Sequence, residues 1–136
     1  MAGKRINFGF VAIIAVIIAL AIYAFFAKKE SLNIAPVQLK SMLDSKSRFR
    51  LIDVRQPSEF AVGHIAGAEL LPLRDIQQGK YNLDKSDTII LYCRSGRRSG
   101  IAAKILKDSG YEYVRNLAGG ILKWEYGLVS DSPSAE

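Results

Sequence analysis

Residues 91–100 read LYCRSGRRSG, and their first two residues close an apolar run, TIILY (88–92), that contains β-branched residues. An apolar helical pattern, IAAKIL (101–106), follows them. Cys93, the only cysteine of the chain, therefore lies where a buried strand is expected to end and a helix to begin. In an open α/β sheet, ligands bind at this position.

The chemistry expected of Cys93 is that of a thiolate. Backbone N–H groups in such a turn, together with the N-terminus of the following helix, point toward an anion bound there. Arg94, Arg97 and Arg98 crowd the same loop, and cationic neighbours lower the pKa of a thiol. The alternative is that Cys93 is a small buried apolar residue, as free cysteines often are, although an inert cysteine does not need three adjacent cations.

The length of the loop favours a single bound sulfur atom. Cys93 to Arg98 comprises six residues, including Ser95 and Gly96, and Ser99 follows it. Cysteine phosphatases, which bind a phosphate, have one more residue between cysteine and arginine. The smaller ring of amides suits a sulfur attached to the cysteine better than a tetrahedral phosphate beyond it.

Three motifs occur in the order found in one known family. The loop CRSGRR (93–98) resembles the active-site loop of rhodanese-type sulfurtransferases. The segments LIDVR (51–55), EF (59–60) and GHIAGA (63–68) resemble the family's N-terminal signature. GGILKW (119–124) resembles its C-terminal signature, and the resemblance covers residues 33–128. It implies a three-layer α/β/α fold with a parallel sheet, and the alternation of strand and helix patterns predicts the same class.

The resemblance also implies a reaction in two halves. The Cys93 thiolate would take the outer sulfur of a small anionic donor such as thiosulfate, and a thiol or cyanide would then accept that sulfur from the persulfide. The amides of residues 94–98 would stabilise the terminal sulfur as an oxyanion hole does. Arg94 and Arg97 would attract the donor at the rim, and Arg98 would fold back to brace the loop. The resemblance implies no cofactor.

Two other functions fit parts of the pattern. A membrane-tethered adaptor or persulfide carrier would keep the fold, act with a protein partner and turn over no small molecule. An intact Cys93 in an arginine-rich loop argues against pure scaffolding. A phosphatase or arsenate-reducing enzyme on a related fold would need the longer loop.

A second polar cluster consists of Asp53, Arg55, Glu59 and His64. In a functional interpretation, Asp53 or Arg55 contacts substrate. In a structural one, which we favour, Arg55 pairs with a carboxylate to fix its loop, and His64 bonds the backbone. No histidine base is required, because arginines and amides already account for an activated Cys93.

The segment 8–27 has twenty residues and no charge, enough for a helix to cross the hydrocarbon core of a bilayer. Lys4 and Arg5 precede it, and Lys28 and Lys29 follow it. We therefore expect a single transmembrane helix. The alternative is a secretory signal peptide, whose apolar region is usually shorter.

The positive charges on the two sides of this segment are nearly balanced, so they do not orient it. A lone thiolate favours the cytoplasm, where thiols stay reduced, over the periplasm or exterior. The expected organisation is an anchor over 1–29, a rhodanese-like domain over 30–129 and a polar tail over 130–136.

Charge and composition exclude other classes. The basic flanks of the apolar segment, less Glu30, supply +3 of the net charge of +6. The rest of the chain therefore has a net charge of only +3. It also shows no basic stripe with interleaved aromatics, which argues against nucleic-acid binding. A single cysteine excludes an intrachain disulfide, and a single histidine beside it argues against a metal cluster.

Local patterns also predict the elements of the domain. Helices are expected over 36–43, 57–62, 72–76 and 100–108, and strands over 49–54, 68–71, 88–92 and 113–117. Residues 30–34 are expected to be a linker, and Trp124 is expected in the core, on a final helix.

Overall fold

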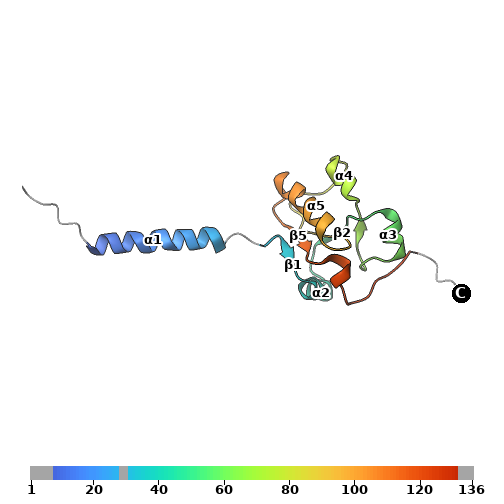
Figure 1. Ribbon diagram of the computed structural model, residues 1–136, viewed down its shortest axis with the longest axis horizontal. Helices are drawn as coiled ribbons and strands as arrows, with labels where there is room; N and C mark the ends of the chain where they lie inside the picture. Colours follow the sequence, from blue (N-terminus) through green and yellow to red (C-terminus); the bar gives the residue numbers. More distant parts are fainter. Residues whose placement is uncertain (1–7, 28–30, 132–136) are drawn as a thin grey trace, which may run out of the picture. The chain divides into compact units, whose positions relative to one another are not determined.

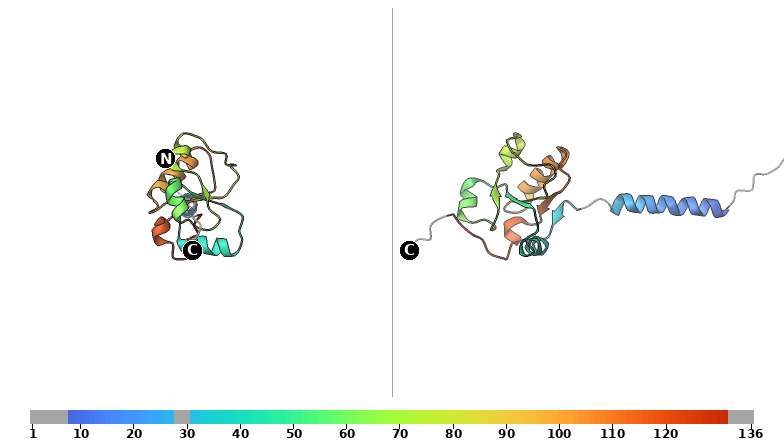
Figure 2. Two further views of the ribbon diagram at one scale, coloured as in Figure 1. Left: turned by 90° about the vertical axis from the view of Figure 1, so that its right-hand side faces the viewer. Right: turned by 180° about the vertical axis from the view of Figure 1, so that it is seen from behind.

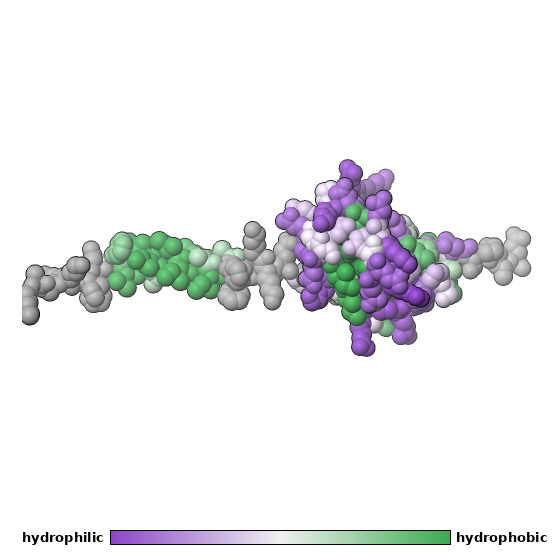
Figure 3. All heavy atoms as spheres, turned by 90° about the horizontal axis from the view of Figure 1, so that it is seen from above, coloured by the Kyte–Doolittle hydropathy of each residue, from purple (hydrophilic) through white to green (hydrophobic). Residues whose placement is uncertain are grey.

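The computed structural model describes residues 8–27 and 31–131, and the chain divides into two compact units with the boundary after Ser31. The first unit contains α1 (Phe8–Ala27), a helix of 20 residues. Side chains are described for residues 9–24 of it, all of them exposed, and Figure 3 shows the helix as apolar along its length. Counting only described residues, no helix is both long and apolar enough to cross a membrane.

The helix predicted over 8–27 is thus confirmed, whereas the membrane span predicted for it is not supported. The basic flanks at Lys4, Arg5, Lys28 and Lys29, and the tail beyond residue 131, lie outside the described residues.

The second unit is built on one parallel sheet of five strands, in the order β1-β5-β4-β2-β3 (Figure 1). The strands are β1 (Asn33–Ile34), β2 (Arg50–Asp53), β3 (Glu69–Leu70), β4 (Ile89–Tyr92) and β5 (Val114–Leu117). The helices are α2 (Pro36–Asp44), α3 (Pro57–Val62), α4 (Leu73–Gln77), α5 (Arg97–Asp108) and the 3₁₀ helix η1 (Gly120–Lys123). The predicted α/β class with a parallel sheet is therefore confirmed.

Helices cover both faces of the sheet (Figure 2), and each face has its own apolar core. On one face, Ile76 of α4 and Ala102 of α5 pack against Ile89 and Leu91. On the other face, α2 and the segment that ends in Trp124 pack against Ile90 and Tyr92 of the same strand. Successive side chains of β4 alternate between the faces, so Cys93, next in the alternation, belongs to the face covered by α5.

The start of α5 and the N-terminal linker differ from the sequence prediction. α5 begins at Arg97, three residues earlier than predicted, because Gly96 adopts a φ of +90° and its carbonyl accepts the N–H of Gly100 at 3.0 Å. Arg97 and Arg98 therefore lie in the first helical turn and not in the loop. The predicted linker contains β1, which pairs with β5 through Asn33 and is too short to show a periodicity.

The final predicted helix is also shorter than expected. η1 is a single 3₁₀ turn, and Trp124 follows it, with 9% of its surface exposed. The prediction that Trp124 lies in the core is confirmed.

Candidate active site

The candidate site lies where the chain changes direction across the sheet. After β2 the chain proceeds to β3 at one edge, and after β4 it proceeds to β5 on the other side. Asp53, at the end of β2, pairs in register with Tyr92, at the end of β4. The loops that follow these two strands therefore emerge side by side, and such a switch point is where open α/β sheets bind ligands.

Cys93 follows β4 directly, and its thiol is held by groups that donate hydrogen bonds. The backbone N–H of Gly96 donates to Sγ at 3.1 Å, and the hydroxyl of Ser99 donates to it at 3.3 Å. Only 1% of the Cys93 surface is exposed. The N-terminus of α5 lies immediately beyond, and its partial positive charge favours an anion on the sulfur.

These donors lower the pKa of the Cys93 thiol. Burial by itself raises the pKa of Cys93, but hydrogen bonds from the Ser99 hydroxyl and from the N–H groups of Ser99, Ser95 and Gly96 lower the pKa below its ordinary value. The predicted lowering of the pKa agrees with this direction. Of the two predicted causes, the backbone amides are among the leading ones and the arginines are not.

Of the three arginines, two are exposed and one is paired with a carboxylate. The side chains of Arg94 and Arg97 are exposed. The guanidinium of Arg98 forms two hydrogen bonds of 2.8 Å with the carboxylate of Glu59. Ser99 was not identified from the sequence as part of the site, although its place in the first turn of the helix after the loop was a usable signal.

Replacing Ser99 with alanine is expected to raise the pKa of Cys93, because the thiolate loses a hydroxyl donor while burial is unchanged. The measurement is the rate of alkylation of Cys93 as a function of pH. Ser95→Ala is the matched control, since the exposed Ser95 contributes only its backbone N–H, and its profile should match that of the unaltered chain. Coinciding profiles for Ser99→Ala and the control would contradict this account.

The loop that begins at Cys93 is hydrogen-bonded to the backbone of η1. The N–H of Ile121 donates to the carbonyl of Cys93 at 2.9 Å, and the N–H of Leu122 donates to that of Arg94 at 3.0 Å. The approach is so close that a Cβ on Gly120 would lie 2.4 Å from the carbonyl oxygen of Cys93. The backbone of η1 thus fixes the position of the first two residues of the loop.

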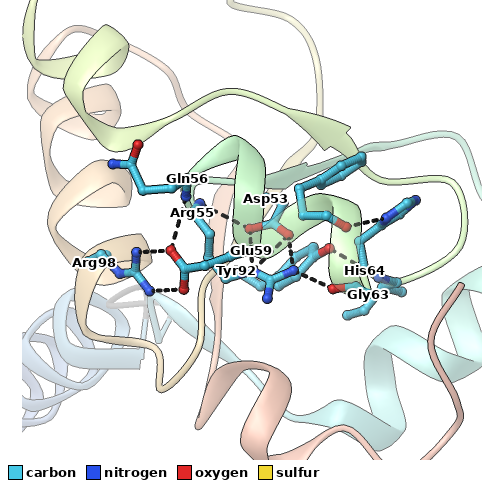
Figure 4. A network of polar contacts seen from close by, with 10 residues as sticks. Asp53, Arg55, Gln56, Glu59, Gly63, His64, Tyr92 and Arg98 are labelled. Carbon is cyan, nitrogen blue, oxygen red and sulfur yellow. Dashed lines mark hydrogen bonds and ion pairs between the residues drawn. The ribbon is translucent and has the colours of Figure 1, made fainter. Parts of the chain in front are cut away.

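The second predicted cluster forms a network beside this loop, shown in Figure 4. Arg55 is buried against Asp53, with 2.6 Å between Nη2 and Oδ2, and it also donates to the carbonyl of Gly63 at 2.6 Å. Asp53 is completely buried, so the paired guanidinium balances its charge. Tyr92 lies in the same network, where its hydroxyl accepts the N–H of Ile65 at 3.1 Å and burial raises its pKa.

His64 lies at the edge of the network and contacts no reacting group. Its Nδ1 donates to the carbonyl of Phe60 at 2.9 Å, and its ring stacks on that of Phe60 with 3.7 Å between centroids. Its backbone pairs with Val129. These contacts, like those of Arg55, are the ones that the structural interpretation expects.

The Glu59–Arg98 pair links α3 to the first turn of α5. The hydrogen bonds from Arg98 lower the pKa of Glu59 from its ordinary 4.5 to about 2. Because the folded state binds this proton less readily than the unfolded chain, the pair stabilises the fold above about pH 4.5, and that stability is lost as the pH falls toward 2.

Glu59→Gln is expected to weaken this acid sensitivity. Since about a third of each side chain is exposed, we expect the unaltered chain to lose on the order of 1 kcal/mol more than the variant between these pH values. Denaturant unfolding at several pH values measures the difference. Glu112→Gln is the control, because Glu112 is exposed and its carboxylate has no ion pair within the described residues. Equal pH slopes for both variants would contradict the assignment.

A cleft of about 360 Å³ adjoins the loop. It is lined by Arg55, Ser58, Glu59, Val62, Arg94, Ile121 and Leu122. A larger hollow of about 520 Å³ lies at the opposite ends of β2 and β4, beside Arg48 and Ser86. We assign the site to the cleft, because it is lined by Arg94, the residue that follows Cys93, whereas the hollow is lined by no residue of this loop. Within the described parts of the chain, no group of three or more His, Cys, Asp or Glu residues could hold a metal ion.

Comparison with known proteins agrees with this geometry. The family model described as rhodanese-like domain matches residues 35–126. YqhL of Bacillus subtilis is 44% identical over 75 residues, which cover 55% of this chain and 60% of YqhL. The thiosulfate sulfurtransferase PspE of Escherichia coli is 42% identical over 72 residues, which cover 52% of this chain and 68% of PspE.

A solved structure shows the same fold. The crystal structure of a rhodanese-like domain protein from Staphylococcus aureus matches with a TM-score of 0.66 and 29% identity, over 74% of this chain and 98% of that one. The chain thus matches nearly all of that structure but less than two thirds of YqhL. Since the family model covers well over half of its residues, the chain belongs to the rhodanese-like domain family.

Proposed function

We propose that this protein is a sulfurtransferase that carries a sulfane sulfur as a persulfide on Cys93. The observation that supports this most is the set of donors around Sγ, from Gly96 at 3.1 Å and Ser99 at 3.3 Å. A sulfur nucleophile with a lowered pKa, next in the sequence to a residue that lines a cleft, suits attack on a sulfur donor. The relation to PspE, named as a thiosulfate sulfurtransferase, makes thiosulfate the first donor to test.

The reaction would proceed in two steps that balance without an external oxidant. The Cys93 thiolate attacks the outer sulfur of thiosulfate, an S–S bond forms to Sγ, and the bond within thiosulfate breaks to release sulfite. The acceptor, cyanide or a thiolate, then attacks the outer sulfur, and the Sγ–S bond breaks with its electron pair returning to Cys93. The amides that stabilise the thiolate also stabilise the persulfide anion, which has the same charge.

The three arginines that follow Cys93 would divide two tasks. Arg94 and Arg97 are exposed cations beside Cys93, and they would raise the local concentration of an anionic donor. Arg98, paired with Glu59, would hold the first turn of α5 in place so that the Ser99 hydroxyl stays aimed at the sulfur.

Turnover of thiosulfate and cyanide by the purified full chain tests the proposal, with thiocyanate as the measured product. Steady formation of thiocyanate supports a sulfurtransferase. Persulfide formation without turnover would indicate a carrier or adaptor that needs a protein partner. Hydrolysis of an aryl phosphate in place of sulfur transfer would indicate a phosphatase and would overturn the proposal.

We further propose that residues 8–27 anchor the protein in a membrane with the catalytic domain on the cytoplasmic side. This part rests on the sequence alone and not on the described helix, because twenty uncharged residues in a helix would span about 30 Å. Release of the chain from membranes by alkaline carbonate would contradict the anchor. Cleavage of the domain by a protease added to spheroplasts would contradict the cytoplasmic orientation.

A further inference from the structure

We propose that the cleft lined by Arg94, the residue after Cys93, selects the acceptor of the sulfur, and that the preferred acceptor is a small aliphatic thiol with a single acidic group. The inference rests on the proposed sulfurtransferase function and concerns its second step. It assigns specificity to Val62 and Leu122, which belong to no predicted site, and to Arg94, which was predicted to attract the donor.

The walls of the cleft are apolar and come from two different elements. Val62, the last residue of α3, is 80% exposed, and Leu122 of η1 is 58% exposed. Ile121 lies next to Leu122 and is half-buried. Exposing such side chains to water is unfavourable, and an alkyl chain lying between them would remove apolar surface from water on both sides.

The charges within the cleft largely cancel. Arg55 is paired with Asp53, and Glu59 is paired with Arg98. Of the charged residues that line the cleft, Arg94 alone has a side chain with no ion pair or hydrogen bond within residues 8–27 and 31–131. One uncompensated positive charge beside an apolar wall complements a ligand with one negative charge and an apolar body.

Cyanide and thiosulfate do not have this form. Each is small and polar throughout, so neither would bury the side chains of Val62 and Leu122. The volume of about 360 Å³ falls in the range of small-molecule sites, which are mostly apolar with a few polar groups that orient the ligand. An aliphatic thiol that ends in a carboxylate uses both features.

The step itself is a transfer without net oxidation. The acceptor loses its thiol proton to solvent, and the resulting thiolate attacks the outer sulfur of the Cys93 persulfide. A new S–S bond forms on the acceptor, the Sγ–S bond breaks, and Cys93 is left as a thiolate. The Leu122 N–H that binds the carbonyl of Arg94 ties the cleft wall to the loop, so the acceptor is positioned relative to the sulfur.

Single-turnover kinetics on the persulfide form of the full chain test the inference. The chain is loaded with thiosulfate, freed of excess donor, and mixed with 3-mercaptopropionate, 6-mercaptohexanoate or 6-mercaptohexanol. Each methylene buried against the cleft is worth about two- to fourfold, so the hexanoate is expected to react about tenfold faster than the propionate. It should also react several-fold faster than the hexanol at low salt, because only the carboxylate pairs with Arg94.

Variants connect these ratios to the cleft. Val62→Ser and Leu122→Ser should each reduce the hexanoate-to-propionate ratio, whereas Arg94→Gln should remove the advantage of hexanoate over hexanol. Val37→Ser is the matched control, since Val37 is 63% exposed on α2 and does not line the cleft. Equal rates for the two chain lengths, or ratios that stay unchanged in the cleft variants, would overturn this inference alone. Absence of sulfite release on loading the unaltered chain would overturn the sulfurtransferase function as well.

Discussion

Cys93→Ser is expected to lower sulfur transfer from thiosulfate to cyanide by at least about a thousandfold, since it removes the only nucleophile that can hold the transferred sulfur. The serine hydroxyl stays protonated at neutral pH and cannot form a persulfide. The change is close to isosteric, and the site already supplies donors from Gly96 and Ser99, so the fold should be retained. Thiocyanate formation under saturating donor measures the loss.

The control for this variant is a comparison of its stability with that of the unaltered protein. Cys93→Ser and the unaltered protein should unfold in denaturant with similar midpoints, which separates loss of chemistry from loss of structure. Thiocyanate formation by a folded Cys93→Ser variant within tenfold of the unaltered rate would contradict the assignment of Cys93 as the nucleophile.

Gly120→Ala is expected to destabilise the fold by about 2–4 kcal/mol and to slow sulfur transfer in the protein that remains folded. The new Cβ would lie 2.4 Å from the Cys93 carbonyl oxygen and 2.7 Å from the carbonyl carbon of Arg94. The backbone of η1 or of the loop must move to relieve this contact. The loop then loses the hydrogen bonds that it accepts from Ile121 and Leu122. Denaturant unfolding and thiocyanate formation measure the two effects.

Gly127→Ala separates the contact from the conformational effect. Both glycines have a positive φ, +56° at Gly120 and +85° at Gly127, but an added Cβ at Gly127 has nothing within 4 Å. The control should cost only about 1 kcal/mol, the penalty for a side chain in the left-handed region, and should leave sulfur transfer unchanged. Equal losses in the two variants would show that η1 does not position the loop.

The sequence predicted the site best where the information was local. The apolar run before Cys93 and the helical pattern after it placed the cysteine at the end of a strand, and β4 and α5 bear this out. The start of α5 was missed because Arg97 and Arg98 carry no apolar periodicity. It depends on the backbone of Gly96, which has a φ of +90°.

Contacts between distant residues could not be read from local patterns. Glu59 and Arg98 are 39 positions apart, and their pairing depends on how the fold brings α3 close to the first turn of α5. For the same reason, the sequence could not rank the arginines against the amides as causes of a low thiol pKa. The guanidinium of Arg98 is hydrogen-bonded to Glu59, although its charge still interacts with Cys93, and the direction of the Ser99 hydroxyl follows from the start of α5.

The central claim is that Cys93, held by N–H and O–H donors, carries a second sulfur. Intact-mass measurement of the full chain after incubation with thiosulfate, and again after addition of cyanide, tests it most directly. The account predicts a mass increase of one sulfur atom that cyanide removes and that is absent from Cys93→Ser. An unchanged mass after thiosulfate, or an increase that persists in Cys93→Ser, would contradict it.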